Sequence, residues 1–177
     1  NTILITAAFY LFFITLRDFF HRKYRNLSQI TAHFSFSILI LSILFNNIFS
    51  SEVITNLKIN ETYQAQNLKI NFESIEQENK QNFKAIKGKF IVEDQSGLIE
   101  VMQPELRIYN QPNIVTSEAD IKTNIFTDKF MTMNYVQNQD YFNIRYQVKP
   151  FMIWIWISTI LLCLSGCLSL IRKKYEN

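Results

Sequence analysis

The chain divides into three apolar stretches and one long segment in which apolar and polar residues alternate. Ile30–Phe49 holds 20 residues and Phe151–Ile171 holds 21, without Asp, Glu, Lys or Arg. At about 1.5 Å per residue, each is long enough for the roughly 30 Å of a bilayer's hydrocarbon core, so both are predicted transmembrane helices. The third stretch, Ile3–Leu16, has only 14 residues, and the chain begins at Asn1. We therefore expect a truncated helix there and a chain that is a piece of a longer protein.

Between the second and third stretches the pattern changes to a period of two, which is typical of half-buried β-strands. The alternating runs are Asn56–Ile59, Asn67–Ile75, Phe83–Val92, Leu98–Met102 and Tyr141–Val148. Asp94–Gly97 is a predicted hairpin turn, because Gly adopts the positive φ that such turns often need. We expect a small, mainly antiparallel β barrel or sandwich of about 100 residues. The pattern between Gln111 and Asn138 favours no particular element.

The charges predict the orientation of these elements in a membrane. The segment between the first two helices has a net charge of +3, and the C-terminal tail has +2. Short basic segments stay on the inner side, which places the β segment, with 11 basic and 13 acidic residues, on the outer face. The predicted order is a truncated transmembrane helix (1–16), an inner basic loop (17–28), a transmembrane helix (29–50), an outer β domain (51–149), a transmembrane helix (150–171) and an inner basic tail (172–177). Because the basic residues gather at the membrane edges, we expect no nucleic-acid partner.

His33 lies inside the apolar stretch 30–49, and an ionisable residue there is a functional-site hypothesis by default. A neutral imidazole commonly binds a metal or a heme iron. The alternative is a histidine that hydrogen-bonds to a neighbouring helix. The residues expected on the same helix face, at spacings of three, four and seven, are Gln29, Phe36, Ser37 and Ile40.

Other candidate groups are few. His21 lies in the basic segment and is predicted to be a surface residue, and the segment from Glu52 to Lys149 contains neither His nor Cys. Cys163 and Cys167 are four residues apart in the last apolar stretch, so we interpret them as small packing residues and not as a disulfide or redox pair.

The order of these features resembles the C-terminal part of the CcmF family, the membrane heme lyase of cytochrome c maturation. The most specific match is Lys149-Pro150-Phe151-Met152-Ile153-Trp154-Ile155-Trp156 before the last helix, where the family has a Lys-Pro-Phe-x-x-Trp-Ile-Trp pattern. Weaker similarities to the family pattern lie at Pro104–Tyr109 and Ser117–Ile121. The chain departs from the family at Ile153, where an Arg is usual.

The resemblance implies a heme lyase subunit that helps attach heme covalently to apocytochrome c, with His33 as one axial ligand of a membrane-embedded heme b. Implied partners are apocytochrome c, a heme chaperone and other cytochrome c maturation subunits. The implied location is a bacterial inner membrane or, alternatively, a mitochondrial one. The second heme ligand and the family's tryptophan-rich segment lie outside this chain, so we do not expect this portion alone to be catalytic.

Two other classes of function stay open at this point. A non-enzymatic, membrane-anchored β module that acts as a scaffold in a respiratory or assembly complex explains the topology equally well, but it has no need of His33. A part of a transporter is less favoured, because the apolar stretches lack the interrupted helices and charged pathway typical of transport.

Overall fold

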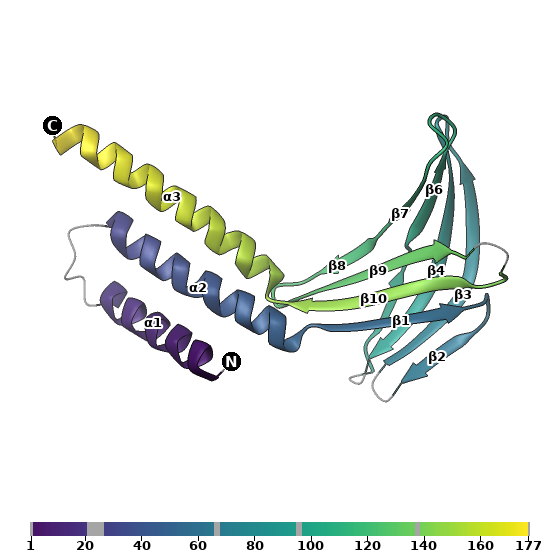
Figure 1. Ribbon diagram of the computed structural model, residues 1–177, viewed down its shortest axis with the longest axis horizontal. Helices are drawn as coiled ribbons and strands as arrows, with labels where there is room; N and C mark the ends of the chain where they lie inside the picture. Colours follow the sequence, from purple (N-terminus) through teal and green to yellow (C-terminus); the bar gives the residue numbers. More distant parts are fainter. Residues whose placement is uncertain (1, 21–26, 66–67, 95–96, 137–138, 177) are drawn as a thin grey trace. The chain divides into compact units, whose positions relative to one another are not determined.

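The computed structural model describes residues 2–20, 27–65, 68–94, 97–136 and 139–176 (Figure 1). They belong to two compact units. The helical unit comprises Asn1–Ser50, Asn124–Asp128 and Lys149–Asn177, and the sandwich unit comprises Ser51–Thr123 and Lys129–Val148.

The helical unit contains three helices that lie side by side: α1 (Thr2–Phe20), α2 (Leu27–Phe49) and α3 (Met152–Glu176) (Figure 1). Each is long and apolar enough to cross a membrane, over Ile3–Phe20, Leu27–Phe49 and Met152–Ile171. The chain is thus a membrane protein, as predicted. Helix α1 continues past Leu16 to Phe20, because one Arg and one Asp in its last turns do not interrupt an otherwise apolar helix.

Serines recur at every seventh residue where α2 packs against α3: Ser28, Ser35 and Ser42 in α2, and Ser158 and Ser165 in α3. The Ser28 hydroxyl donates to the Ser165 carbonyl oxygen at 2.8 Å. One heptad along each helix from that pair, Ser35 and Ser158 have no exposed surface. Because small side chains let helix backbones approach closely in a membrane, these serines explain why α2 and α3 pack here.

The sandwich unit consists of two sheets, and the predicted small antiparallel β domain flanked by apolar helices is confirmed. One sheet has the order β1–β10–β9–β8, and the other has the order β2–β3–β4–β6–β7, with β5 paired to β4. The strands are β1 (Ser51–Leu57), β2 (Thr62–Ala65), β3 (Leu68–Asn79), β4 (Phe83–Asp94), β5 (Ile99–Met102), β6 (Glu105–Tyr109), β7 (Val115–Glu118), β8 (Asp120–Thr123), β9 (Thr127–Tyr135) and β10 (Phe142–Pro150).

The first predicted strand was misplaced. The alternation at Asn56–Ile59 predicted a strand there, but β1 ends at Leu57 and the chain turns at Ile59 and Asn60, where Asn60 has a φ of 65°. The side chain of Glu61 accepts a hydrogen bond from the Lys58 N–H at 2.8 Å and closes this turn. At the next predicted turn, Gly97 has a φ of 75° and its N–H donates to the Asp94 carbonyl at 3.0 Å, as a hairpin turn requires.

The core of the sandwich lies between the two sheets. The rings of Phe72 and Phe90 stack at 4.3 Å and are fully buried. Gly88 faces this core: a Cβ added to it would lie 2.6 Å from the Phe90 ring and 2.8 Å from the Met133 sulfur. The close approach of these side chains therefore requires glycine at position 88.

Candidate functional site

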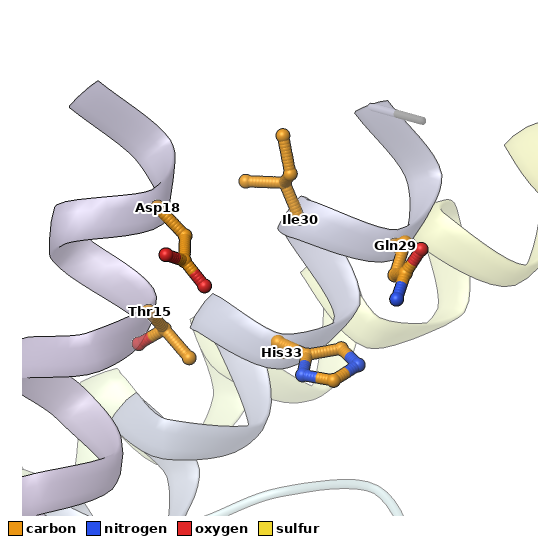
Figure 2. Close-up of a pocket in the computed structure, with 5 residues that line it drawn as sticks. All are labelled: Thr15, Asp18, Gln29, Ile30 and His33. Atoms are coloured by element: carbon orange, nitrogen blue, oxygen red, sulfur yellow. The ribbon is translucent and has the colours of Figure 1, made fainter. Parts of the chain in front are cut away.

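His33 lies in α2 with its side chain exposed on the helical unit. It lines a pocket of about 90 Å³ to which α1 contributes Thr15 and Asp18, and α2 contributes Gln29 and Ile30 (Figure 2). Figure 2 shows the Asp18 carboxylate directed from α1 toward α2, with the imidazole of His33 and the amide of Gln29 both projecting from α2. The sequence hypothesis and the pocket thus coincide at His33.

Hydroxyl and aromatic contacts hold α1 beside this pocket. The Thr15 and Ser37 hydroxyl oxygens are 3.2 Å apart, and both residues are buried. The Phe34 ring stacks with Phe12 at 6.0 Å and with Phe19 at 5.9 Å. Because Phe34 immediately follows His33, these contacts fix the turn of α2 that carries the imidazole.

The expected helix face around His33 is only partly correct. Gln29 joins His33 in the pocket, but Ser37 is fully buried and donates to the Phe34 carbonyl at 2.7 Å. Phe36 is 49% exposed. Residues three and four positions from His33 spread over a broad face of α2. Helix α1 covers the side of that face that carries Ser37 and leaves the side that carries Phe36 open.

Asp18 is the site residue that sequence reasoning missed. We expected it in an inner loop, whereas α1 extends through it and places it in the pocket of His33. Its carboxylate is 3.5 Å from the Arg17 guanidinium, and 29% of its side chain is exposed. The three-residue spacing from Thr15 to Asp18 is the helical signal that would have indicated a shared face.

The donor set suits a single axial ligand and does not suit a metal ion held by several side chains. Among the described residues, no group of three or more His, Cys, Asp or Glu side chains gathers to hold a metal. A structural zinc site needs about four such ligands. Small-molecule sites usually enclose roughly 300–1,000 Å³, so the pocket beside His33 cannot by itself enclose a porphyrin. The exposed imidazole fits a heme iron approached from outside the three helices.

The motif before α3 forms a second cluster within the helical unit. The Asn46 side chain donates to the Pro150 carbonyl at 2.7 Å. Phe151 has a φ of 60°, and its N–H donates to the Phe126 carbonyl at 2.7 Å while its ring packs on Phe45 at 5.3 Å. A bulky residue with φ in this left-handed region lowers stability by about 1–2 kcal/mol. The hydrogen bond and the ring contact of Phe151 offset that loss.

The remaining predicted residues lie away from the pocket. Cys163 and Cys167 are both exposed on α3 and are not joined in a disulfide, and their interpretation as packing residues stays a prediction. Trp156 is 62% exposed, whereas the indole nitrogen of Trp154 is buried without a hydrogen-bond partner among the described residues. His21 lies outside the described residues.

Fold and site together define a membrane-anchored β-sandwich protein whose described helices carry one exposed imidazole, that of His33. Residues 48–150 match the family model described as CcmF C-terminal beta-sandwich, and this match spans more than half of the chain. The chain therefore belongs to that family, which confirms the resemblance read from the sequence.

Relatives and a solved structure agree with this assignment. The chain is 29% identical over 120 residues to the cytochrome c-type biogenesis protein ccl1 of Rhodobacter capsulatus, covering 68% of this chain and 18% of that protein. It is 24% identical over 167 residues to the cytochrome c-type biogenesis protein CcmF of Haemophilus influenzae, covering 92% of this chain and 26% of that protein. The solved structure of a cytochrome c heme lyase, CcmF, has a similar fold, with a TM-score of 0.62 at 17% identity, covering 80% of this chain and 24% of that one. The chain thus spans about a quarter or less of the length of these relatives.

Proposed function

We propose that this chain is the C-terminal portion of a cytochrome c heme lyase subunit, which helps attach heme covalently to apocytochrome c. The observation that carries the proposal is the family match over residues 48–150 in a chain that also presents His33 on α2. The names of the relatives and of the similar structure refer to cytochrome c biogenesis and heme lyase activity, which supports the same conclusion.

In this proposal His33 is an axial ligand of a heme b embedded among membrane helices. Its exposed side chain leaves the imidazole accessible to an iron, and α1 packs on the adjacent side of α2. When bound, such a heme supplies one-electron chemistry whose potential depends on its axial ligands. The second ligand and the remaining walls belong to parts of the protein beyond this chain.

Asp18 and Gln29 are the residues proposed to orient the imidazole. A ligating histidine almost always donates its other ring N–H to a carboxylate, a carbonyl or a water, which fixes its tautomer and its rotation. The Asp18 carboxylate and the Gln29 amide oxygen are acceptors that line the same pocket as His33. The pocket of about 90 Å³ has room for a bridging water, since one water occupies roughly 30 Å³ of liquid volume.

The proposed orientation places the sandwich unit on the outer face of a bacterial inner membrane, with a mitochondrial inner membrane as the alternative. It follows from the basic residues between α1 and α2 and after α3. On that face the sandwich unit meets apocytochrome c, the heme chaperone and other maturation subunits. A cysteine introduced at Ser96 should react with an impermeant thiol reagent added outside, and one at Asn177 should not.

His33→Ala in the full-length protein tests the proposal. We expect loss of most of the bound heme b and of cytochrome c maturation, because an iron that loses a strong axial ligand is held weakly. The measurements are the heme content of the purified protein, its low-spin absorption spectrum and the yield of mature cytochrome c. Added imidazole should partly restore the spectrum, because the vacated space matches the lost ring.

His21→Ala is the matched control and should change neither heme content nor maturation. Normal heme content, an unchanged spectrum and full maturation in His33→Ala would contradict the assignment of His33. The scaffold function, which needs no imidazole, would then be the better explanation.

A further inference from the structure

A cleft of about 540 Å³ opens between the two sheets of the sandwich unit. Its walls are largely apolar and come from strands of both sheets. The lining residues are Ser51, Val53, Ala65, Leu68, Asp94, Lys129, Tyr146 and Val148. The volume lies within the roughly 300–1,000 Å³ typical of binding sites, whereas none of these residues belongs to the pocket of His33.

One end of the cleft carries a partly buried ion-pair cluster with an excess negative charge. The Lys129 ammonium, only 12% exposed, is 2.7 Å from the Glu100 carboxylate and 3.7 Å from that of Asp94. Two carboxylates against one ammonium leave a net charge of −1. Burial, followed by the nearby Glu100 and Asp94, raises the pKa of Tyr146 to about 12, so its hydroxyl stays neutral. The cleft therefore disfavours anions and attracts a cation on an apolar stem.

The strand that borders the cleft also has an open edge. Among the described strands, β1 ends the four-stranded sheet and pairs only with β10. The other edge strands β2, β7 and β8 have four residues each, whereas β1 has seven. Its one charged residue, Glu52, is paired with Arg145. Proteins usually protect edge strands by shortness or charge, and β1 has little of either protection.

We propose that β1 and the cleft bind an extended segment of a partner polypeptide that carries a Lys or Arg. A strand added beside β1 would direct alternate side chains toward the cleft, as Ser51 and Val53 already are. The basic head of the partner's side chain pairs with the Asp94 carboxylate, while its stem and a neighbouring apolar residue cover Val53, Leu68 and Val148. This proposal does not rest on heme ligation by His33.

The test uses the purified full-length protein and short fluorescent peptides of alternating Val and Thr. One peptide has a central Lys, and its two counterparts have norleucine or Glu at that position. We expect the Lys peptide to bind most tightly and the Glu peptide least tightly, measured by fluorescence anisotropy. A hydrogen bond between charged groups is worth enough for Asp94→Asn to weaken binding of the Lys peptide about tenfold.

Two variants separate this effect from damage to the fold. Asn at position 94 keeps the oxygen that accepts the Leu98 N–H at 3.2 Å, so the turn is retained. Glu93→Gln makes the same change of charge one residue away, where the side chain points to the opposite sheet face and lies 3.9 Å from Lys69. It should leave binding of the Lys peptide unchanged.

Methylation of the peptide backbone tests the added strand. N-methylation of alternate amides on one edge of the Lys peptide should abolish binding, whereas the same methylation on the other edge should not. Equal binding of the Lys, norleucine and Glu peptides would overturn the proposal. So would the absence of binding to the full-length protein, because it would mean that another part of that protein covers β1.

Discussion

The helical unit and the sandwich unit bury opposite kinds of side chain. In the sandwich unit the fully buried residues include Phe72, Phe90 and Ile70, and ion pairs cover the surface. Among the described residues of the helical unit, the fully buried ones are Ser35, Ser37 and Ser158, whereas large residues such as Ile3 and Leu170 are exposed. The difference shows that one chain is folded for two solvents. Water drives apolar side chains inward, whereas lipid leaves close packing and hydroxyl hydrogen bonds to hold helices together.

The same substitution should have very different effects in the two units. Phe72→Ala removes a ring with no exposed surface and should cost about 3–5 kcal/mol of sandwich stability, because it leaves a cavity in the core. Phe36→Ala removes a ring that is 49% exposed on α2 and should change stability by about 0.5 kcal/mol or less. Hydrogen exchange of the strand and helix amides measures both, and equal costs would refute the comparison.

Replacing a glycine by alanine should also have different effects on stability in the two units. Gly88→Ala should destabilise the sandwich unit by about 1–3 kcal/mol, because the new Cβ meets Phe90 and Met133 inside contact distance. Gly166→Ala in α3 meets nothing within 4 Å and should stabilise that helix slightly. Thermal unfolding of the two variants in the same detergent checks the opposite signs. Destabilisation by both would mean that α3 has an unrecognised close contact at Gly166.

Enlarging a buried serine tests the packing of α2 on α3. Ser158→Leu should weaken that contact by about 1–3 kcal/mol, because its side chain is fully buried. Thr159→Leu, on an exposed position of the same helix, is the control and should have little effect. The measurement is oxidative cross-linking between cysteines introduced at Ser28 and Ser165, in a protein without Cys163 and Cys167. Equal cross-linking in both variants would show that Ser158 does not lie in the helix contact.

The smallest effect is expected for the surface ion pairs of the sandwich unit. A hydrogen bond from Lys87, helped by the charge of Lys80, holds the pKa of Glu78 below its usual range. Its favourable contribution is therefore present above the ordinary carboxyl pKa and is lost as the pH falls through the lowered pKa. Glu78→Gln should slightly lower the melting temperature at neutral pH, and the difference should vanish in acid and in about 1 M salt. A difference that persists in acid would assign the effect to packing.

The sequence predicted the parts of this fold that depend on one dominant local force. Long uncharged runs indicated the helices, and alternation located the strands that contain Phe72 and Phe90. It missed β2, β6, β7, β8 and β9. Strands of four or five residues are too short to show a period, and in the nine-residue β9 the adjacent Phe130 and Met131 interrupt the alternation.

The candidate site was predictable in His33 and in Gln29, which lies one helical turn before it. His33 stands out because an imidazole is rare in an apolar helix. Asp18 and Thr15 join it only through the packing of α1 on α2, which depends on the Thr15–Ser37 contact and the stacked Phe34 ring. The cleft beside β1 was unpredictable for the same reason, since its lining comes from strands far apart along the chain.

The hydroxyl groups of the helical unit also indicate the order of its assembly. Ser37, Ser158 and Ser165 each donate to a carbonyl three residues earlier in their own helix, at 2.7 to 2.9 Å. These hydrogen bonds need no second helix, so a single helix can enter the bilayer without an unsatisfied hydroxyl at these positions. Ser35 is the exception, because its buried hydroxyl has no partner among the described residues. The packing of α2 against α1 and α3 leaves this hydroxyl without a partner in the described part of the chain, so at Ser35 the close approach of the helices is gained at the cost of one hydrogen bond.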